Sequence, residues 1–440
     1  MSSTTIVSQA TPVGNSAISI VRLSGPSSVS YSKKLSNSKT LFKHQRPKHL
    51  PIYIKKTKKI DSAIYMFFES PNSYTGEDLV EISCHGNQHI TIAVINELLA
   101  FGAVLADPGE YTRRAFLNGK IDLFQAESVG LLIQAKSLAA AEQQSKNISG
   151  EASKQILKIK KKTISILALI EYELDISEET YFSQSRATAS IKKLTQLKQS
   201  INDLVETFEL GNAYTQGSKI VFAGMPNAGK STLINMILKN NKILTSPKPG
   251  TTRDIIATEI SLEGFPVSLV DTAGIHETED EIEIAGIEKT KQEIRTADVI
   301  INVFSPSHQP IDFIEDTREI LVHNKTDLQK YNGINKNVCC VSALSGEGVK
   351  TLKTKIKNTI ASTKTDGALP LITTLRQKES LTKASSSIHK SISLLRLANA
   401  QLELVAEELT SAISELDITT GKTTTNDILD SVFSSFCVGK

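Results

Sequence analysis

A glycine-rich segment that ends in lysine and serine carries the clearest chemistry in this sequence. Residues Gly224–Ser231 read GMPNAGKS and satisfy the pattern G-x-x-x-x-G-K-[ST] in full, directly after an apolar run at Lys219–Ala223. In such a loop the glycines let backbone N–H groups face phosphate oxygens, at the positive end of the following helix. Lys230 would neutralise phosphate charge, and the Ser231 hydroxyl would ligate Mg²⁺. The segment therefore predicts a nucleotide-binding site.

The next motifs supply further groups for the metal and the terminal phosphate. Thr252 lies in the sequence GTTRD at Gly250–Asp254 and could complete the Mg²⁺ shell. An apolar run then ends in DTAG at Asp271–Gly274. Asp271 would be the carboxylate in the second coordination shell of Mg²⁺, and the position of Gly274 could respond to the γ-phosphate.

The base would be selected by a motif further along the chain. Asn324–Asp327 reads NKTD and follows the apolar residues Ile320–Val322. An aspartate here can accept two hydrogen bonds from guanine, whereas adenine would leave it unpaired. The backbone of Ser342–Leu344 would meet guanine O6, and five such motifs in order predict a GTP-binding domain. The residues expected at the nucleotide are Asn227, Ala228, Gly229, Lys230, Ser231, Thr232, Thr251, Thr252, Asp271, Thr272, Ala273, Gly274, Asn324, Lys325, Asp327, Ser342, Ala343 and Leu344.

These residue patterns leave the hydrolytic step open. Many GTPases place a glutamine after the Asp-x-x-Gly motif to orient the attacking water, but Ile275 stands there. Carboxylates follow, and no spacing rule selects one among Glu277, Glu279, Asp280, Glu281, Glu283 and Glu288. Apart from Arg253 there is no obvious arginine finger. A monovalent cation beside the Asn227 side-chain oxygen could supply the positive charge instead.

Four blocks of sequence must position these groups. The first runs to about Asn118 and contains short β-like runs such as Ala17–Leu23. The second, to about Glu209, and the fourth, from about Leu375, have the apolar spacing of amphipathic helices. The third, about Gly217–Thr363, alternates apolar strands with helical segments. Because apolar helix faces must be buried, the two helical blocks look like halves of one domain, with two independent hairpins as the alternative.

Length and composition are those of a folded, non-membrane protein. At roughly 150 residues per domain, 440 residues predict about three domains. Apolar residues make up 40% and charged residues 22%, and no apolar run approaches the ~18 residues that cross a bilayer. The N-terminus lacks a secretory or transit pattern, and four cysteines form no disulfide framework or spaced metal motif. These features favour the cytoplasm of a bacterium.

Positive charge is concentrated near the N-terminus. Met1–Ile60 contains no Asp or Glu and eleven Lys or Arg, of which ten fall between Lys33 and Lys59. The segment is either a solvated basic loop or a surface that faces a polyanion such as nucleic acid.

Beyond the GTP motifs, the whole chain resembles the MnmE (TrmE) family of tRNA-modification GTPases. The motifs that carry this resemblance are IVRLSG at Ile20–Gly25, NSYTGEDLVEI at Asn72–Ile82, CHG at Cys84–Gly86, PGEYTRRAFLNGK at Pro108–Lys120 and FSSFCVGK at Phe433–Lys440. The last is similar to the Cys-x-Gly-Lys signature at the family's C-terminus. This sequence departs from the family pattern at Pro12–Ala17 and at Asn87, where the family usually has a glycine.

The resemblance implies an α/β P-loop GTPase domain inserted in an all-α helical domain, preceded by an α+β tetrahydrofolate-binding domain. The expected boundaries are 1–118 for the folate-binding and dimerisation domain, 119–216 and 366–440 for the halves of the helical domain, and 217–365 for the G domain. It also implies a homodimer that forms a heterotetramer with an MnmG (GidA)-type flavoprotein. The pair would add a carboxymethylaminomethyl or aminomethyl group to C5 of the wobble uridine of certain tRNAs.

The resemblance further implies cofactors and residue roles. The cofactors are Mg²⁺, K⁺ and 5-formyl- or methylene-tetrahydrofolate, with FAD and NADH held by the partner only. Glu283 matches the carboxylate that orients water, and Cys437 belongs to the C-terminal motif as a candidate catalytic residue. Potassium would be held by Asn227 and the loop Ser246–Thr251, through Ser246, Lys248 and Thr251, with Ser246 also at the nucleotide. Arg22, Glu81, Lys120 and Lys440 match positions that contact the folate.

A different class of function remains as the alternative. A GTP-dependent switch in ribosome assembly would bind RNA without catalysing modification, and the G domain and basic segment fit it equally well. The folate-contacting set discriminates between the two, because a pure switch has no reason to possess it.

Overall fold

The structure is a computed structural model. It describes residues 4–39, 42–176, 184–239, 257–271, 291–311, 318–333, 335, 337–361, 370–397, 401–423 and 425–439. Contacts between Cα atoms divide the chain into two compact units, one of residues 1–130 with 414–440 and the other of residues 131–413. No helix in the described ranges is long and apolar enough to cross a membrane.

The first unit is built on a six-stranded sheet in the order β3-β4-β5-β2-β1-β6. All neighbouring strands are antiparallel except β1 and β6, which run parallel. The strands are β1 (Ile6–Gln9), β2 (Ile18–Ser24), β3 (Lys48–Ile54), β4 (Lys58–Phe68), β5 (Leu79–His85) and β6 (Val104–Leu105). The expected strand at Ala17–Leu23 is confirmed by β2, and β3 is an edge strand of the sheet.

Helices α1 (Ser28–Ser36) and α2 (Gln88–Ala100) bury an apolar face of this sheet. Leu35 of α1 and Val94 and Leu98 of α2 are fully buried against alternate strand residues, as the two-residue period of a strand requires. The departure at Asn87 has a structural reason. Its side-chain oxygen accepts the His89 N–H at 2.9 Å, so Asn87 caps the start of α2.

Three further helices complete the first unit. They are α3 (Glu110–Leu117), the start of α4 (Leu123–Gln134) and α14 (Asn426–Ser434). Leu123 and Ala126 of α4 pack on Leu429 and Phe433 of α14 in one apolar cluster. The end of the chain therefore packs in the same compact unit as its beginning.

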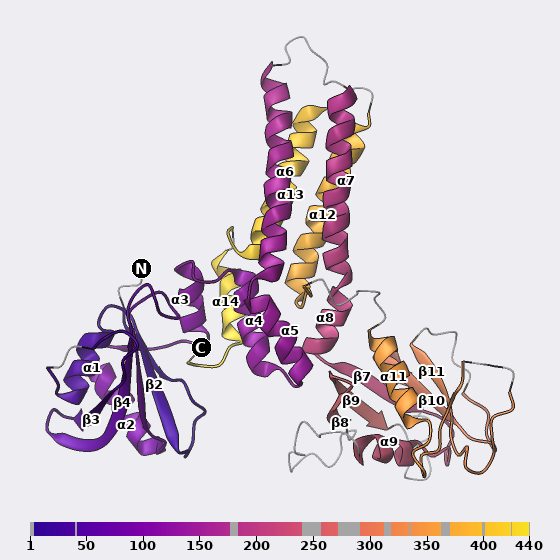
Figure 1. Cartoon of the computed structure of the whole chain (residues 1–440), viewed down its shortest axis with the longest axis horizontal. Helices are drawn as coiled ribbons and strands as arrows, with labels where there is room; N and C mark the ends of the chain where they lie inside the picture. The colour runs from indigo at the N-terminus through magenta and orange to yellow at the C-terminus, as the bar shows by residue number, and fades with distance from the viewer. Residues whose placement is uncertain are drawn as a thin grey trace. The chain divides into compact units, whose positions relative to one another are not determined.

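The second unit contains a helical bundle made by segments on both sides of the inserted sheet. Its helices are α5 (Leu138–Ile148), α6 (Glu151–Ile176), α7 (Gln184–Glu206), α8 (Phe208–Thr215), α12 (Leu375–Leu395) and α13 (Leu402–Thr420), of which α13 extends into the other unit. Helices α6, α7, α12 and α13 run alongside one another (Figure 1), with Ser385 of α12 donating to Asn202 of α7. The helical segments before and after the sheet thus form one bundle rather than two separate hairpins.

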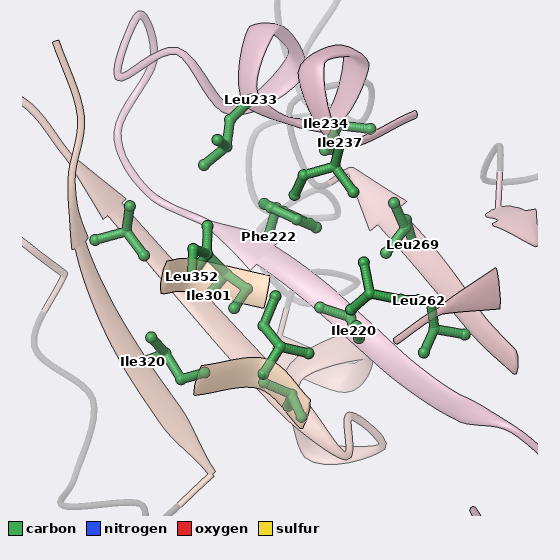
Figure 2. Packing of buried hydrophobic residues seen from close by; sticks show 14 of the residues in the cluster. Ile220, Phe222, Leu233, Ile234, Ile237, Leu262, Leu269, Ile301, Ile320 and Leu352 are labelled. Carbon is green, nitrogen blue, oxygen red and sulfur yellow. The ribbon is translucent and has the colours of Figure 1, made fainter. Parts of the chain in front are cut away.

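The inserted sheet has six strands in the order β12-β11-β10-β7-β9-β8. They are β7 (Ser218–Ala223), β8 (Ala257–Leu262), β9 (Phe265–Asp271), β10 (Val299–Phe304), β11 (Glu319–His323) and β12 (Cys339–Cys340). Every pair is parallel except β8 with β9. Helices α9 (Lys230–Lys239) and α11 (Val349–Ile360) pack on it. Figure 2 shows Leu233 of α9 near Phe222 of β7, and Leu352 of α11 near Ile301 of β10.

Candidate functional site

The described residues among those predicted at the nucleotide lie at one edge of the inserted sheet. Parallel strands end at the same edge, so the loops that follow β7, β11 and β12 meet there, and β9 ends there at Asp271. Chain order reverses at β7, which lies between β9 and β10. In open α/β sheets, ligands bind in the crevice at such a reversal point.

Two glycines of the loop between β7 and α9 sit where no other residue fits. Gly224 has φ of +149°, and a Cβ there would lie 2.1 Å from the Val303 carbonyl oxygen. Gly229 has φ of +91°, and a Cβ there would lie 2.3 Å from Asn324 Nδ2. The loop is therefore pressed against both neighbouring segments, which holds its backbone N–H groups in place for phosphate.

Lys230 begins α9 and is buried, with 5% of its surface exposed. Its ammonium donates to the carbonyl oxygens of Gly224 at 2.8 Å and Met225 at 3.1 Å. Burial lowers the pKa of Lys230, and the nearby Asp271 carboxylate opposes that effect. A phosphate group would supply the opposite charge that this desolvated ammonium needs.

Ser231 and Asp271 are the described residues that the sequence predicts at the metal ion. The Ser231 hydroxyl donates to Asp271 Oδ2 at 2.6 Å. A hydroxyl beside a carboxylate is the oxygen chemistry that Mg²⁺ prefers. Within the described residues no three His, Cys, Asp or Glu side chains converge on one point.

The Asn324 side chain connects three loops by hydrogen bonds, in addition to its place in the motif predicted to bind the base. Its buried amide nitrogen donates to the Ala228 carbonyl at 2.9 Å, and its amide oxygen accepts the Ala343 N–H at 3.0 Å. Lys325 adds a bond from its ammonium to the Asn227 carbonyl at 2.8 Å. The motif alone gave no signal for these bonds, which tie the base-binding loops to the phosphate loop.

Asp327 presents an exposed carboxylate at the same edge. Its Oδ1 accepts the Ser342 hydroxyl at 2.6 Å, so the two loops predicted at the guanine hold each other. Ala343 is buried, and Leu344 is exposed with 79% of its surface. Asn227, Ser231 and Thr232 are also exposed at this edge. The edge thus combines buried hydrogen bonds between loops with exposed polar groups that a nucleotide can reach.

Several predicted residues lie outside the described part of the chain. They are Ser246, Lys248, Thr251, Thr252, Thr272, Ala273, Gly274, Glu283 and Lys440.

A second polar site lies in the first unit. The Arg22 guanidinium donates to Glu81 Oε1 at 2.9 Å and forms an ion pair with it at 2.8 Å. It also donates to the Gly439 carbonyl at 2.9 Å and stacks over the Tyr111 ring. The site therefore brings Arg22, Glu81 and the tail that carries the exposed Cys437 together from distant parts of the sequence.

Lys120 lies apart from this pair among the described contacts. Its ammonium donates to the Pro71 carbonyl at 2.9 Å, and its side chain passes the position where Gly76 would carry a Cβ. The loop that Lys120 contacts leads into Glu77, whose carboxylate accepts the Ser24 hydroxyl at 2.8 Å. Ser24 ends the strand that carries Arg22, which links the surroundings of the two cations.

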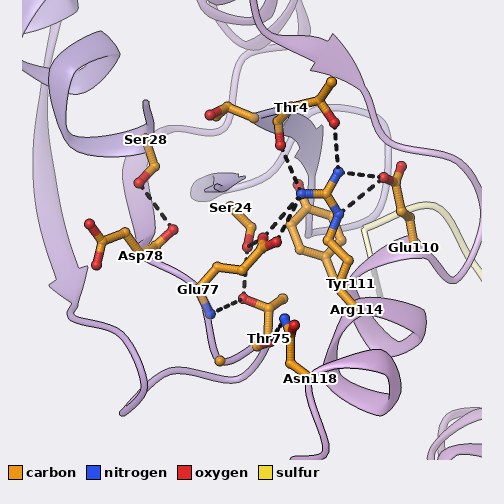
Figure 3. A network of polar contacts seen from close by, with 12 residues as sticks. Thr4, Ser24, Ser28, Thr75, Glu77, Asp78, Glu110, Tyr111, Arg114 and Asn118 are labelled. Carbon is orange, nitrogen blue, oxygen red and sulfur yellow. Dashed lines mark hydrogen bonds and ion pairs between the residues drawn. The ribbon is translucent and has the colours of Figure 1, made fainter. Parts of the chain in front are cut away.

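A buried charge network supports this loop (Figure 3). Arg114 pairs with Glu77 at 3.1 Å and with Glu110 at 2.7 Å, and it donates to the Thr4 carbonyl at 2.9 Å. Arg114 is 5% exposed and Glu77 is 8% exposed. Sequence reasoning missed the network, although its members lie in the motifs that carry the family resemblance.

The histidine of the CHG motif holds a buried carboxylate. Burial of Asp61 would raise its pKa, but hydrogen bonds from the His85 backbone N–H at 3.0 Å and ring at 2.7 Å outweigh this, so the pKa lies below the usual 3.8. The stability gained from this lowered pKa is present above about pH 4 and is lost as the pH falls through the folded-state value. We expect the difference in unfolding free energy between wild type and Asp61→Asn to be constant above about pH 5 and to shrink below pH 4 in urea titrations.

Comparisons with known proteins cover nearly the whole chain. A family model described as GTP-binding protein TrmE N-terminus matches residues 5–120, and one described as MnmE helical domain matches residues 123–437. A relative from Syntrophus aciditrophicus (strain SB), named tRNA modification GTPase MnmE, is 37% identical over 460 residues, covering 99% of each chain. Relatives of the same name from Koribacter versatilis (strain Ellin345) and Aquifex aeolicus (strain VF5) are 34% and 35% identical, also covering 99% of each chain.

Proposed function

The chain belongs to the MnmE family of tRNA modification GTPases, and from this premise we propose the reaction that it serves. With an MnmG/GidA-type flavoprotein that carries FAD and NADH, it adds a carboxymethylaminomethyl or aminomethyl group to C5 of the wobble uridine of certain tRNAs in the cytoplasm. GTP hydrolysis by a K⁺-stimulated homodimer drives the cycle. The observation that carries this proposal is the meeting of Arg22, Glu81 and the C-terminal tail, for which a GTP-dependent switch has no use.

The charges at this second site suit a folate. Folates carry carboxylates on a glutamate tail and N–H groups on an aminopyrimidine edge. Arg22 and Lys120 are cations of the kind that pair with carboxylates, and the Glu81 carboxylate can accept from N–H donors. The Arg22 and Glu81 side chains are 15% and 24% exposed, so a ligand can reach both. Bound tetrahydrofolate would supply the one-carbon unit, held by Arg22, Glu81, Lys120 and Lys440 beside Cys437.

The residues at the nucleotide have different roles in GTP binding and hydrolysis. Lys230 exchanges two carbonyl acceptors for phosphate oxygens, and Asp327 accepts the guanine N–H groups. Glu283 orients the attacking water in place of a glutamine. Mg²⁺ bound at Ser231 and Thr252, together with K⁺, would neutralise charge that develops on the phosphates. The groups proposed for K⁺ are Asn227, Ser246, Lys248 and Thr251.

Contacts within the second unit support a relay from the nucleotide to the helical bundle. Strand β9 ends at Asp271, and it begins after the turn that joins it to β8. At that turn Ser137 donates to the Gly264 carbonyl at 2.6 Å, while Lys136 pairs with Glu259 of β8 at 2.8 Å. Tyr214 of α8 stacks on Phe265 with ring centroids 4.4 Å apart. A shift of Asp271 along β9 would therefore displace the residues at the start of β9 that contact α5 and α8.

This relay predicts that a single hydroxyl couples hydrolysis to modification. We expect Ser137→Ala to keep GTP hydrolysis within about twofold of wild type, since Ser137 contacts the turn and not the nucleotide edge. The tRNA modified per GTP hydrolysed should fall about fivefold, the equivalent of one hydrogen bond. Mass spectrometry of tRNA and phosphate release measure the two quantities in one reaction with the cognate flavoprotein.

The matched control for this variant is Thr374→Ala. Both residues cap helices of the bundle, Ser137 for α5 and Thr374 for α12, so each loss costs about 1 kcal/mol of stability. Only Ser137 contacts the strand turn. An equal fall in modification yield for both variants would assign the effect to helix stability and refute the relay.

Complementation tests the proposed function as a whole. A bacterial strain without its own enzyme should regain C5-modified wobble uridine, detected by mass spectrometry, when it carries this chain and its cognate flavoprotein. Arg22→Gln should abolish the modification while the purified variant still hydrolyses GTP, because Arg22 lies outside the nucleotide site. Failure of the wild-type chain to restore modification, with K⁺-stimulated hydrolysis intact, would favour the ribosome-assembly switch.

A further inference from the structure

The basic N-terminal segment is not a loose loop but the outer edge of a sheet. Strand β3 borders the six-stranded sheet, and a hairpin turn joins it to β4. We define the basic edge as the six residues Arg46, Lys48, Lys55, Lys56, Lys58 and Lys59. At a rise of about 3.3 Å per residue, the stretch from Arg46 to Lys55 spans roughly 30 Å. The border therefore carries cations at both ends of β3, two at its start and four at the hairpin.

The hairpin turn holds two lysines in a conformation that lysine rarely adopts. Lys55 has φ of +50° and Lys56 has φ of +65°. Hairpin turns with two left-handed residues strongly prefer glycine and asparagine, because a larger side chain is strained there. The sequence places two cations at the tip despite this strain, next to Lys58 and Lys59.

The cations of the basic edge are largely without acidic neighbours. Among described residues, no ion pair joins Arg46, Lys55, Lys56, Lys58 or Lys59 to a carboxylate, and all five are exposed. The Glu97 side chain accepts the Lys55 backbone N–H at 3.0 Å, and Asp61 follows Lys59 by two residues on β4, where it bonds to the His85 ring. Two carboxylates do not neutralise four lysines at the hairpin. The basic edge therefore carries a net positive field toward solvent.

The occupant that fits this edge is the sugar-phosphate backbone of an RNA. A protein strand is a poor fit, because Pro51 and Lys48 on β3 are the residue types that block strand addition to an edge. Exposed aromatic rings that would stack on bases are sparse, so the contacts are those of phosphate charge and not of sequence reading. We infer that the basic edge binds the backbone of the tRNA whose wobble uridine is modified. This inference rests on the proposed function, which supplies the RNA.

The test compares two variants of the full chain with the same net charge. One carries Lys55→Gln, Lys56→Gln, Lys58→Gln and Lys59→Gln in the basic edge. The control carries Lys154→Gln, Lys158→Gln, Lys161→Gln and Lys162→Gln, four exposed lysines of α6. Fluorescence anisotropy with unmodified tRNA, from 50 to 300 mM KCl, gives the affinity and its dependence on salt.

For the basic-edge variant we expect affinity at 100 mM KCl to fall at least tenfold and the slope of log K against log salt to decrease by about 3. The control should change either quantity less than half as much, and both variants should hydrolyse GTP at the wild-type rate. Wild-type tRNA affinity and slope in the basic-edge variant would overturn the inference, as would an equal loss in the control. Loss of binding only to phosphatidylglycerol vesicles, with tRNA binding intact, would overturn it in favour of a membrane surface.

These outcomes are separable from failure of the proposed function. The binding experiment does not depend on modification, and the complementation experiment does not depend on the basic edge. If complementation succeeds while the basic-edge variant binds tRNA normally, only the inference fails. If the basic-edge variant loses tRNA affinity as expected while the wild-type chain fails in complementation, the basic edge binds RNA and the proposed modification reaction is refuted.

Discussion

The change Asp327→Asn is expected to move the nucleotide preference of this protein from GTP to xanthosine 5′-triphosphate, altering the ratio of the two kcat/KM values on the order of 10³-fold. A carboxylate accepts hydrogen bonds from both guanine N1–H and N2–H₂. An asparagine presents one N–H group instead, which opposes the guanine amino group but suits the carbonyl oxygen at C2 of xanthine. Unpaired polar groups in a site built for hydrogen bonding make such changes large.

The surrounding loop should survive this substitution. Asp327 Oδ1 accepts the Ser342 hydroxyl at 2.6 Å, and the asparagine oxygen can accept the same bond. Hydrolysis of both nucleotides at matched concentrations measures the preference. Asp298→Asn is the control, since its carboxylate accepts the Lys219 N–H at the opposite edge of the sheet and should leave the preference unchanged. A similar loss with GTP and xanthosine triphosphate would mean that Asp327 acts on loop structure and not on the base.

The largest effect on stability is expected from Arg114→Met. Arg114 is buried with Glu77, and the substitution leaves that carboxylate without its cation and the Thr4 carbonyl without its donor. Breaking a buried ion pair by removing one partner costs about 3–5 kcal/mol. Hydrogen exchange of β1 and β5 amides at increasing urea concentration should report a loss of this size in the first unit.

The neighbouring residue provides a matched control. Arg113 also pairs with a carboxylate, Asp430, but the two side chains are 34% and 61% exposed. Exposed pairs contribute about 0–1 kcal/mol, so Arg113→Met should leave amide exchange nearly unchanged. Equal losses for the two variants would show that the charge on α3, and not the buried network, stabilises the unit. GTP affinity should be unaffected in both, because the network lies outside the inserted sheet.

Local sequence was sufficient to place the described nucleotide residues on one edge. The motifs at 224–231, 271–274, 324–327 and 342–344 each follow an apolar run that forms a parallel strand, and parallel strands end at a common edge. The glycines of the phosphate loop could be recognised because their spacing serves a backbone requirement that is independent of distant residues. The base motif could likewise be recognised from the hydrogen-bonding groups of guanine.

Contacts between distant segments could not be obtained in this way. The bond from Arg22 to the Gly439 carbonyl joins residues 417 positions apart, and no periodicity links them. The bonds of Asn324 to Ala228 and Ala343 depend on how close three loops come after the strands have assembled. Residue type identified Asn324 as part of a motif, whereas tertiary packing determined the hydrogen-bond partners of its side-chain amide.

The sequence alone thus determined the chemistry of this protein, and the tertiary structure determined where that chemistry is supported. The groups expected to bind phosphate, metal and guanine could be recognised because they belong to short motifs of local sequence. The basic edge required the sheet order, since only that order shows that β3 lies at the border with the exposed lysines of the hairpin at its end. The hydrogen bond from Ser137 to the Gly264 carbonyl could be found only in the folded structure. The two residues are 127 positions apart, so tertiary packing and not a local sequence pattern brings them together.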